Sequence, residues 1–101
     1  MTVSKKTILI VGLGRFGTSL CEKLSDLGQT VIVVDSLSAP VVEIADKIDV
    51  SAQVDVADEA SLVKVGAKEV DVAVVTIGEA IEKSILCASI LVDLGVPFVI
   101  A

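Results

Sequence analysis

The sequence predicts an α/β domain in which helices cover both faces of one doubly wound parallel sheet. Short runs rich in valine and isoleucine alternate along the chain with longer segments whose apolar residues recur at helical spacing. Apolar residues make up 53% of the chain, as expected when strands are buried on both faces. Strands joined by crossover helices pair in parallel, and we expect the strand order 3-2-1-4-5.

Strands and helices are expected to alternate from one end of the chain to the other. The expected strands are Thr7–Val11, Val31–Val34, Ile48–Ala52, Val70–Thr76 and Pro97–Ala101. The expected helices are Phe16–Leu27, Ser38–Lys47, Asp58–Val65 and Glu79–Leu94. The predicted apolar face of the first helix consists of Phe16, Leu20, Leu24 and Leu27. Ser38 is predicted to cap the second helix.

The length and the end of the chain bear on its organisation. A length of 101 residues fits one domain, and we expect residues 1–101 to form a single unit. The chain stops on an apolar strand with no helix after it. Because proteins seldom leave a fresh apolar edge uncovered, we expect this chain to be a truncated fragment of a longer protein.

Composition argues against several classes of protein. A net charge of −6 and only two aromatic residues argue against nucleic-acid binding. The longest apolar helical stretch, Ile85–Leu94, contains Ser89 and Asp93 and is too short for a membrane span, so we expect no direct membrane insertion. Cys21 and Cys87 are expected to be small buried side chains rather than disulfide or metal partners. Free cysteines and no secretory signal predict a cytoplasmic protein.

A glycine-rich motif, Gly12-Leu-Gly14-Arg-Phe-Gly17, follows the first strand directly and opens the first helix. In that setting Gly12 permits a tight turn, Gly14 lets the backbone approach a pyrophosphate, and Gly17 lets the helix pack closely on the strand. The free N–H groups at the start of the helix, around Phe16, favour a phosphate. The motif therefore predicts a Rossmann-type nucleotide site. The alternative is a glycine-rich turn without a ligand.

An acidic residue stands where the ribose of such a nucleotide would lie. Asp35 closes the second strand, 18 residues after Gly17, and its carboxylate can accept hydrogen bonds from the ribose hydroxyls. The following Ser36 and Leu37 offer no arginine for a 2′-phosphate, and the carboxylate would repel one. We therefore expect Asp35 and Ser36 to contact an adenosine ribose and to discriminate against NADP. The alternative for Asp35 is a helix cap or a solvated turn.

Two further charged residues flank the expected cleft. The guanidinium of Arg15, inside the glycine loop, can reach phosphate oxygens in a bidentate manner, or it is a solvated side chain. Asp55 and the adjoining Val56 follow the third strand, where the adenine is expected. Asp55 has an equally simple alternative as a cap for the helix that begins at Asp58.

The fourth strand ends at the point where the strand order reverses, which is where ligands bind in such sheets. Its last residues, Thr76, Ile77 and Gly78, are expected to wall the phosphate crevice with their backbone. Glu79 and Glu82, in the next helix, are explained by the helix dipole. Lys83 is interpreted as a solvated residue.

Taken together, these segments resemble the TrkA-N (RCK/KTN) domain over essentially the whole chain. The resemblance rests on Ile8-Leu-Ile-Val-Gly-Leu-Gly-Arg-Phe-Gly17, on Val-Val-Asp35, on Asp55 before a short helix, and on Val-Val-Thr-Ile-Gly78 before a long one. The family usually has Gly-Asp-Ala where this chain has Val54-Asp55-Val56, which implies a narrower adenine pocket.

The resemblance implies a nucleotide sensor rather than an enzyme. It implies NAD(H) or ATP/ADP as the ligand, and it matches Gly12, Gly14, Arg15 and Gly17 to the phosphate loop. Asp35 matches the ribose acid, and Asp55 matches the acidic residue near the adenine. The expected partners are further copies of the chain, as a dimer within an octameric ring, and a potassium-translocating membrane subunit. That subunit would hold the domain at the inner face of the cell membrane.

The alternative function is the cofactor-binding half of an NAD-dependent oxidoreductase, because one fold hosts many activities. The chain lacks histidine and tyrosine, and no pairing of a nucleophile with a base is visible. A structural assembly domain without a ligand is a third interpretation. It would leave the glycine loop without a purpose.

Overall fold

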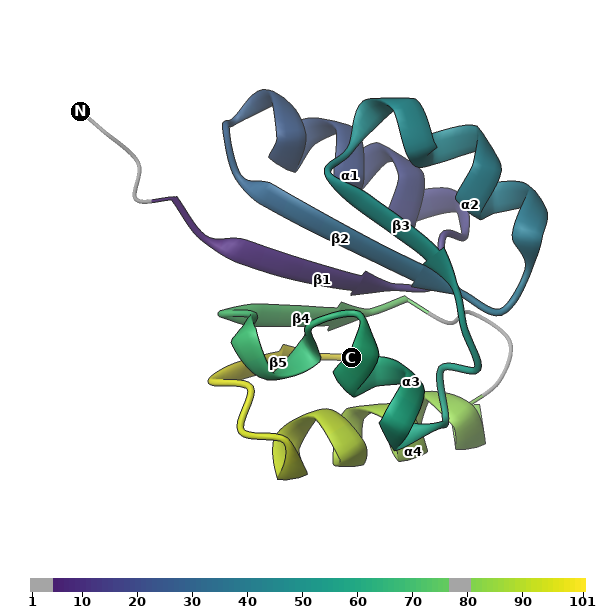
Figure 1. Ribbon diagram of the computed structural model, residues 1–101, viewed down its shortest axis with the longest axis vertical. Helices are drawn as coiled ribbons and strands as arrows, with labels where there is room; N and C mark the ends of the chain where they lie inside the picture. Colours follow the sequence, from purple (N-terminus) through teal and green to yellow (C-terminus); the bar gives the residue numbers. More distant parts are fainter. Residues whose placement is uncertain (1–4, 77–80) are drawn as a thin grey trace.

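Five parallel strands form one sheet in the order β3-β2-β1-β4-β5, as Figure 1 shows. A computed structural model describes residues 5–76 and 81–101, and for Arg15 it describes the backbone alone. The strands are β1 (Thr7–Val11), β2 (Thr30–Asp35), β3 (Val50–Gln53), β4 (Val72–Val75) and β5 (Phe98–Ile100). In the central register, Ile8 of β1 stands opposite Val31 of β2 and Val72 of β4. The predicted fold class and strand order are confirmed.

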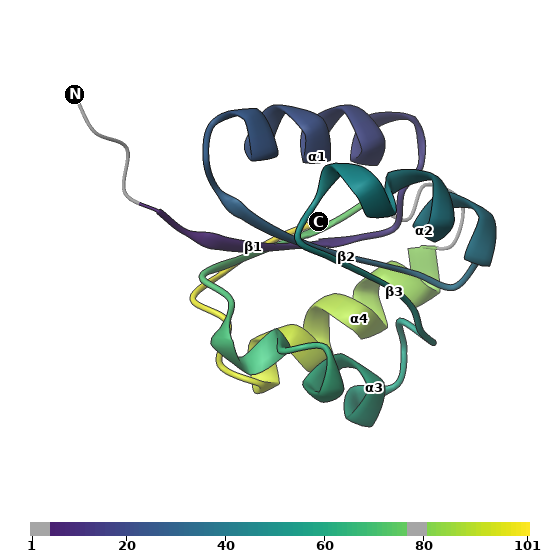
Figure 2. The ribbon, with the colours of Figure 1, turned by 45° about the horizontal axis from the view of Figure 1, so that its top comes forward.

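Helices cover both faces of this sheet. They are α1 (Arg15–Asp26), α2 (Ser38–Ile44), α3 (Glu59–Lys64) and α4 (Ile81–Asp93), with 3-10 turns η1 (Ala45–Lys47) and η2 (Ala67–Glu69). Figures 1 and 2 show α1 and α2 on one face and α3 and α4 on the other. Within residues 5–76 and 81–101, every helix is too short or too polar to cross a bilayer.

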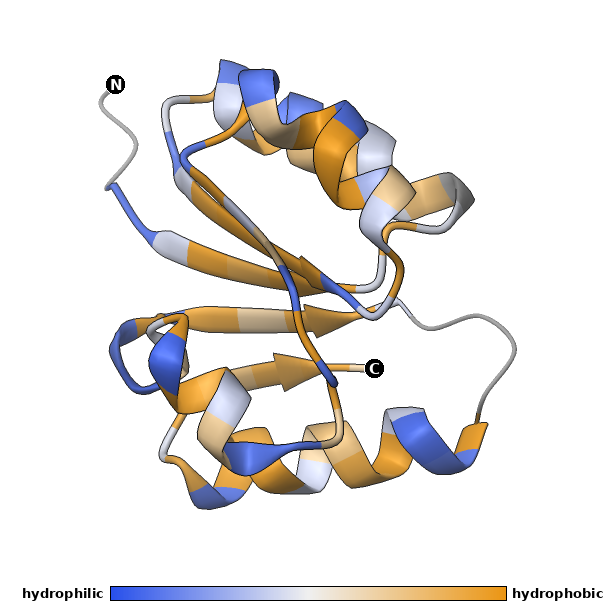
Figure 3. Cartoon of the chain, turned by 45° about the vertical axis from the view of Figure 1, so that its right-hand side comes forward, coloured by the Kyte–Doolittle hydropathy of each residue, from blue (hydrophilic) through white to orange (hydrophobic). Residues whose placement is uncertain are grey.

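Two apolar cores lie on either side of the sheet because successive side chains of a strand point to opposite faces. Leu9 and Val11 of β1 belong to the core beneath α3 and α4, whereas Ile8 and Ile10 belong to the core beneath α1 and α2. Figure 3 shows the resulting apolar strands.

The two cysteines lie on opposite sides of the sheet. Cys21 lies in the core beneath α1, and Cys87 lies in the core beneath α4. Both are buried and free, as predicted. Burial raises the pKa of each thiol to about 11, so both thiols stay protonated at neutral pH.

The structure corrects the predicted apolar face of α1. The buried side of the helix is centred on Gly17 and Cys21, with Leu20 and Leu24 packed beside them. Phe16 lies one residue away from Gly17, a turn of about 100° around the helix, and its side chain is 82% exposed. Leu27, just beyond the last turn, is also exposed.

Several predicted element ends differ by one to three residues, and two of them are informative. Ser38 is the first residue of α2 and not its cap, because the extended Leu37 takes the N-cap position without any side-chain hydrogen bond. The third strand begins at Val50 instead of Ile48. The preceding Asp49 is used differently: its carboxylate accepts a hydrogen bond of 2.9 Å from the backbone N–H of Val31.

The hydrogen bond that Asp49 accepts is one of three similar contacts at the amino ends of the strands. Asp71, directly before β4, accepts a hydrogen bond of 2.9 Å from the N–H of Thr7 in β1. Gln29, directly before β2, accepts one of 2.6 Å from the N–H of Lys6. In each case the residue that precedes one strand satisfies a backbone donor at the start of its neighbour, and so helps to hold the register.

We therefore expect Asp71→Ala to lower the free energy of unfolding by about 1–3 kcal/mol, because the Thr7 N–H would lose its acceptor at a partly buried position. Urea denaturation followed by circular dichroism would measure the change. Asp46→Ala is the matched control, since Asp46 is exposed on η1, and its effect should stay within about 0.5 kcal/mol. Equal effects of the two substitutions would contradict a role for the Asp71 bond.

Candidate functional site

The glycine loop lies at the carboxyl ends of the strands, between β1 and α1. Gly12 has a φ of +89°, a left-handed conformation that strongly favours glycine. Its N–H donates a hydrogen bond of 2.8 Å to the carbonyl of Val34 in β2. The tight turn predicted at Gly12 is therefore present, and it is anchored to the neighbouring strand.

The other two glycines of the loop differ in what surrounds them. A Cβ atom at Gly17 would lie 2.6 Å from the carbonyl oxygen of Gly12, so the close approach of α1 to the loop excludes any side chain there. Among residues 5–76 and 81–101, a Cβ atom at Gly14 would meet only the Thr76 carbonyl oxygen, at an ordinary 3.8 Å. The described residues therefore leave room for a side chain at Gly14. This fits the interpretation that Gly14 keeps space for a ligand.

The start of α1 is suited to an anion. Gly14 is the N-cap residue and has no side chain, so no side chain caps the helix, and the first turn contains no acidic residue. The N–H groups of a helix start carry a positive partial charge and need acceptors. A phosphate group would supply them.

Asp35, the residue predicted to contact the ribose, is hydrogen-bonded to the glycine loop. Its Oδ2 accepts a hydrogen bond of 2.8 Å from the N–H of Leu13, and its Oδ1 accepts one of 2.9 Å from the N–H of Leu37. The residue is half-buried. The alternative role as a helix cap is wrong, because Leu37 is the cap of α2. The bond from the Leu37 N–H is an exposed contact within the turn after β2, so a structural role in that turn accompanies the bond to Leu13. Each carboxylate oxygen can accept a second hydrogen bond, so capacity for a ribose hydroxyl remains.

Thr76 fastens the loop from the opposite side. Its backbone N–H donates a hydrogen bond of 2.7 Å to the carbonyl of Val11. Its hydroxyl lies 3.2 Å from the same carbonyl and also contacts the carbonyl of Gly12. The sequence predicted a role for the backbone here, and the structure adds one for the hydroxyl. Ile77 and Gly78, predicted beside Thr76, lie outside the described residues.

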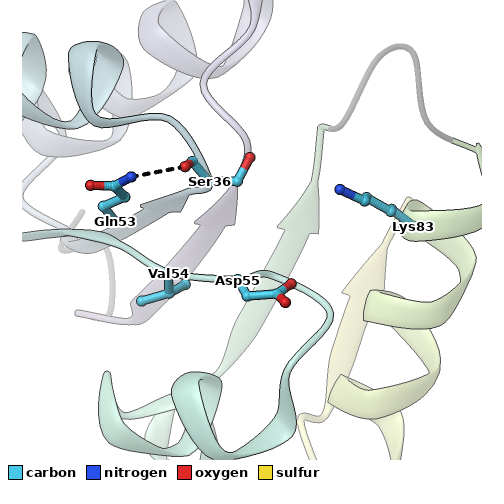
Figure 4. A pocket seen from close by; sticks show the side chains of 5 residues that line it. All are labelled: Ser36, Gln53, Val54, Asp55 and Lys83. Carbon is cyan, nitrogen blue, oxygen red and sulfur yellow. Dashed lines mark hydrogen bonds between the residues drawn. The ribbon is translucent and has the colours of Figure 1, made fainter.

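A hollow of about 310 Å³ opens next to Asp35, at the ends of β2 and β3, as Figure 4 shows. It is lined by Ser36, Gln53, Val54, Asp55 and Lys83. The side-chain amide of Gln53 donates a hydrogen bond of 3.1 Å to the carbonyl of Ser36. The N–H of Val54 donates one of 3.0 Å to the carbonyl of Asp35. These bonds hold the loop after β2 against the end of β3.

Asp55 lies at this hollow and does not cap α3. Its Oδ1 accepts a hydrogen bond of 3.0 Å from the N–H of Ala57. The cap of α3 is Asp58, whose Oδ2 accepts from the N–H and the hydroxyl of Ser61 at 3.1 and 2.6 Å. Those two bonds lower the pKa of Asp58. The capping alternative for Asp55 is therefore wrong.

The structure does not show the side chains of three other predicted residues at the site. The side chain of Val56 is buried in the core and is not part of the lining of the hollow, so only its backbone is left for a ligand. Phe16 lies in the first turn of α1 with its ring exposed. Arg15 is the first residue of that helix, and its side chain is outside the described part of the structure.

Sequence reasoning missed two residues of the hollow, Gln53 and Lys83, whereas Val54 belongs to the segment expected to narrow the adenine pocket. Lys83 was interpreted as a solvated residue, yet it reaches the hollow from the first turn of α4. Its place seven residues after Thr76, in the helix that follows the switch-point strand, is the signal that could have identified it.

A second hollow, of about 390 Å³, is lined by Glu22, Ser25, Asp26 and Lys47. It contains none of the predicted site residues. Lys47 and Glu22 form an exposed ion pair there at 2.8 Å. The lining thus carries two carboxylates against one ammonium group, which does not suit a phosphate, and we do not assign this hollow to the site.

Comparisons with known proteins agree on one family. The model of the TrkA-N domain family matches residues 8–101. The Ktr system potassium uptake protein C of Bacillus subtilis (strain 168) is 40% identical over 92 residues, which are 91% of this chain and 42% of that protein. The chain thus spans less than half the length of this curated relative.

Solved structures share the fold. The TrkA-N domain of the inner membrane protein ybaL from Escherichia coli has a TM-score of 0.71 at 17% identity, over 96% of this chain and 87% of that one. A UDP-glucose-4-epimerase (galE) from Stenotrophomonas maltophila, crystallised with NAD and formylated UDP-arabinopyranose, has a TM-score of 0.72 at 23% identity, over 93% and 35%. At these identities the likeness concerns the fold alone.

The two glycines should respond differently to an added methyl group. Gly17→Ala should lower the free energy of unfolding by about 1–3 kcal/mol, because the Cβ atom cannot fit against Gly12 without moving the backbone. Gly14→Ala should cost less than about 1 kcal/mol, the usual scale for a change at an N-cap. Chemical denaturation of both variants would measure this. Equal losses would show that Gly14 is also required by the fold.

Proposed function

The chain belongs to the TrkA-N domain family, and from that premise we propose that it is a nucleotide-sensing regulatory domain. Residues 1–101 would act as one unit that binds NAD(H) or ATP/ADP and controls a potassium channel or transporter. The observation that carries the proposal is the hydrogen bond from the Leu13 N–H to the Asp35 carboxylate. It joins the residue proposed to bind the ribose to the loop proposed to bind the phosphates.

The ligand would lie along the carboxyl edge of the sheet. Its phosphates would bind the N–H groups at the start of α1, around Gly14 and Arg15, and its ribose would bind Asp35. The adenine would occupy the hollow beside Asp55 and Ser36, with Thr76 holding the loop from below. A 2′-phosphate would face the negative charge of Asp35, so NADP would bind poorly.

The regulatory step would be a shift between conformations. A ligand moves such an equilibrium only if it binds one state more tightly than the other. Two nucleotides can share the adenosine contacts and differ in their phosphates. Their contacts with Arg15 would then differ, and so would their preference for one conformation. A tenfold difference in affinity supplies about 1.4 kcal/mol, and linked copies would add their contributions.

The name of the Bacillus subtilis relative indicates the process that such a domain would control. That protein is named a potassium uptake protein. We propose that this chain likewise acts on a potassium-translocating membrane subunit. It would then lie in the cytoplasm, at the inner face of the membrane, through that partner and without inserting itself.

We favour a switch over an enzyme because the described residues around the cleft include no histidine, tyrosine or accessible thiol. The chain has no histidine, and its two thiols are buried with their pKa raised to about 11. In the described part of the chain, no three histidine, cysteine or acidic residues are grouped to hold a metal ion. The hydroxyl of Thr76 contacts only backbone carbonyls among the described residues.

Thermal denaturation in the presence of nucleotides tests the proposal. ADP, ATP, NAD or NADH should raise the melting temperature, because a ligand that binds only the folded state adds stability. At a ligand concentration one hundred times the Kd, the free energy of unfolding rises by about 2.7 kcal/mol. NADP should have little effect. Gly14→Ala should abolish the shift while leaving the melting temperature without ligand nearly unchanged, because its Cβ atom would enter the space for the phosphates.

The outcomes separate the possible functions. If no adenine nucleotide stabilises the wild-type chain, it is not a sensor of this kind. If NADP stabilises it as well as NAD does, the assignment of Asp35 to the ribose is wrong. Reduction of NAD by a hydroxy acid, catalysed by the full-length protein, would favour the oxidoreductase instead.

We also propose that the chain self-associates. Ile81, Ile85 and Val92 are exposed apolar residues at helical spacing along α4, and Figure 3 shows the apolar character of this helix. A helix that is apolar on its outer side as well as its inner side is usually covered on both. A second copy packed there would supply that cover.

Ile85→Glu should therefore lower the molar mass measured by light scattering after gel filtration, because a carboxylate would have to be buried between copies. Val42→Glu on α2 is the matched control, with an original side chain 71% exposed against 65% for Ile85. It should leave the molar mass unchanged. A monomeric wild-type chain, or equal masses for the three proteins, would contradict self-association through α4.

A further inference from the structure

Among the described residues, Lys83 is the one that contributes a positive charge to the lining of the hollow at the carboxyl ends of β2 and β3 and the amino end of α4. Figure 4 shows its side chain leaving α4 and pointing across the hollow toward the side occupied by Ser36 and Asp55. Those two residues come from the loops that follow β2 and β3. One cation thus faces one carboxylate across a space of about 310 Å³.

The ammonium group of Lys83 has no hydrogen-bond or ion-pair partner within residues 5–76 and 81–101. It differs in this from Lys47, whose charge is matched by Glu22. The chain as a whole is acidic, with 14 acidic residues against eight basic ones. A cation that points into a hollow without a partner is therefore available to a ligand.

We propose that Lys83 is a specificity-determining residue that contacts the adenine base, an inference that rests on the nucleotide-binding function proposed above. The ammonium group would donate a hydrogen bond to an acceptor nitrogen of the ring. The Asp55 carboxylate opposite would accept one from the exocyclic amino group. Adenine offers both kinds of group, whereas guanine carries an oxygen acceptor in place of that amino group. Lys83 and Asp55 together would thus select adenine.

The position of Lys83 along the cleft separates this role from phosphate binding. The phosphate loop follows β1 and lies on the far side of Asp35, with which it shares the Leu13 hydrogen bond. The lining of the hollow comes instead from the residues after β2 and β3 and from α4. The contribution of Lys83 should therefore be the same for every ligand that carries adenosine, whatever its number of phosphates.

Calorimetric titration of the wild-type chain and of Lys83→Met with AMP, ADP and ATP tests the proposal. Methionine keeps an unbranched apolar side chain and removes the charge. We expect the variant to bind all three nucleotides about tenfold more weakly, the loss expected for one hydrogen bond to a charged group at a solvated site. Lys83→Arg should recover most of the affinity. Lys68→Met, on η2 at the amino ends of the strands, is the matched control and should bind like the wild type.

Each other result would overturn the proposal in a recognisable way. A loss of affinity that grows from AMP to ATP would mean that Lys83 contacts phosphate. Unchanged affinity in Lys83→Met would mean that the side chain is only solvated, while the nucleotide-sensing function would stand. If the wild-type chain binds none of the three nucleotides, the proposed function fails together with the role of Lys83.

Discussion

The hydrogen bond between the Leu13 N–H and the Asp35 carboxylate is the contact on which the carboxyl edge of the sheet depends. It joins the loop after β1 to the end of β2, and the bond from the Gly12 N–H to the Val34 carbonyl runs beside it. Thr76 holds the same loop from β4. Three strands thereby fix one short loop, so the start of α1 has a defined direction before any ligand binds. Such pre-organisation lowers the cost of binding.

The fold could be predicted because its main determinants are local in the sequence. Apolar runs and helix-ending glycines indicate alternating elements, and the handedness of crossovers then leaves few strand orders. Element ends were predicted less well, because neighbouring side chains compete for them. Ser38 is a good capping residue, but Leu37 occupies the N-cap of α2. The prediction that Phe16 lies on the buried side of α1 is wrong, because the tight packing of Gly17 on the loop decides which side of the helix is buried.

In the candidate site, too, some residues could be predicted from the local sequence and others could not. The glycines and Asp35 could be found because the spacing between a phosphate loop and its ribose acid is set by one strand–helix–strand unit. Thr76 contacts Gly12 across 64 residues of sequence, and Lys83 and Asp55 line one hollow because α4 begins at the edge where β3 ends. No local sequence pattern predicts that these distant residues lie close together. Their proximity follows from the strand order and can be seen only in the folded structure.

The polar side chains at the two edges of the sheet differ in how much of their hydrogen-bonding capacity the protein itself uses. At the amino edge, Asp49, Asp71 and Gln29 each accept a hydrogen bond from a strand N–H, and these bonds stabilise the register. At the carboxyl edge, the Asp35 oxygens keep spare acceptor capacity, and Lys83 has no partner among the described residues. Side-chain bonds therefore hold both edges, and those at the carboxyl edge come from Asp35, Gln53 and Thr76. The capacity left over at the carboxyl edge is what supports the proposal that a ligand binds there.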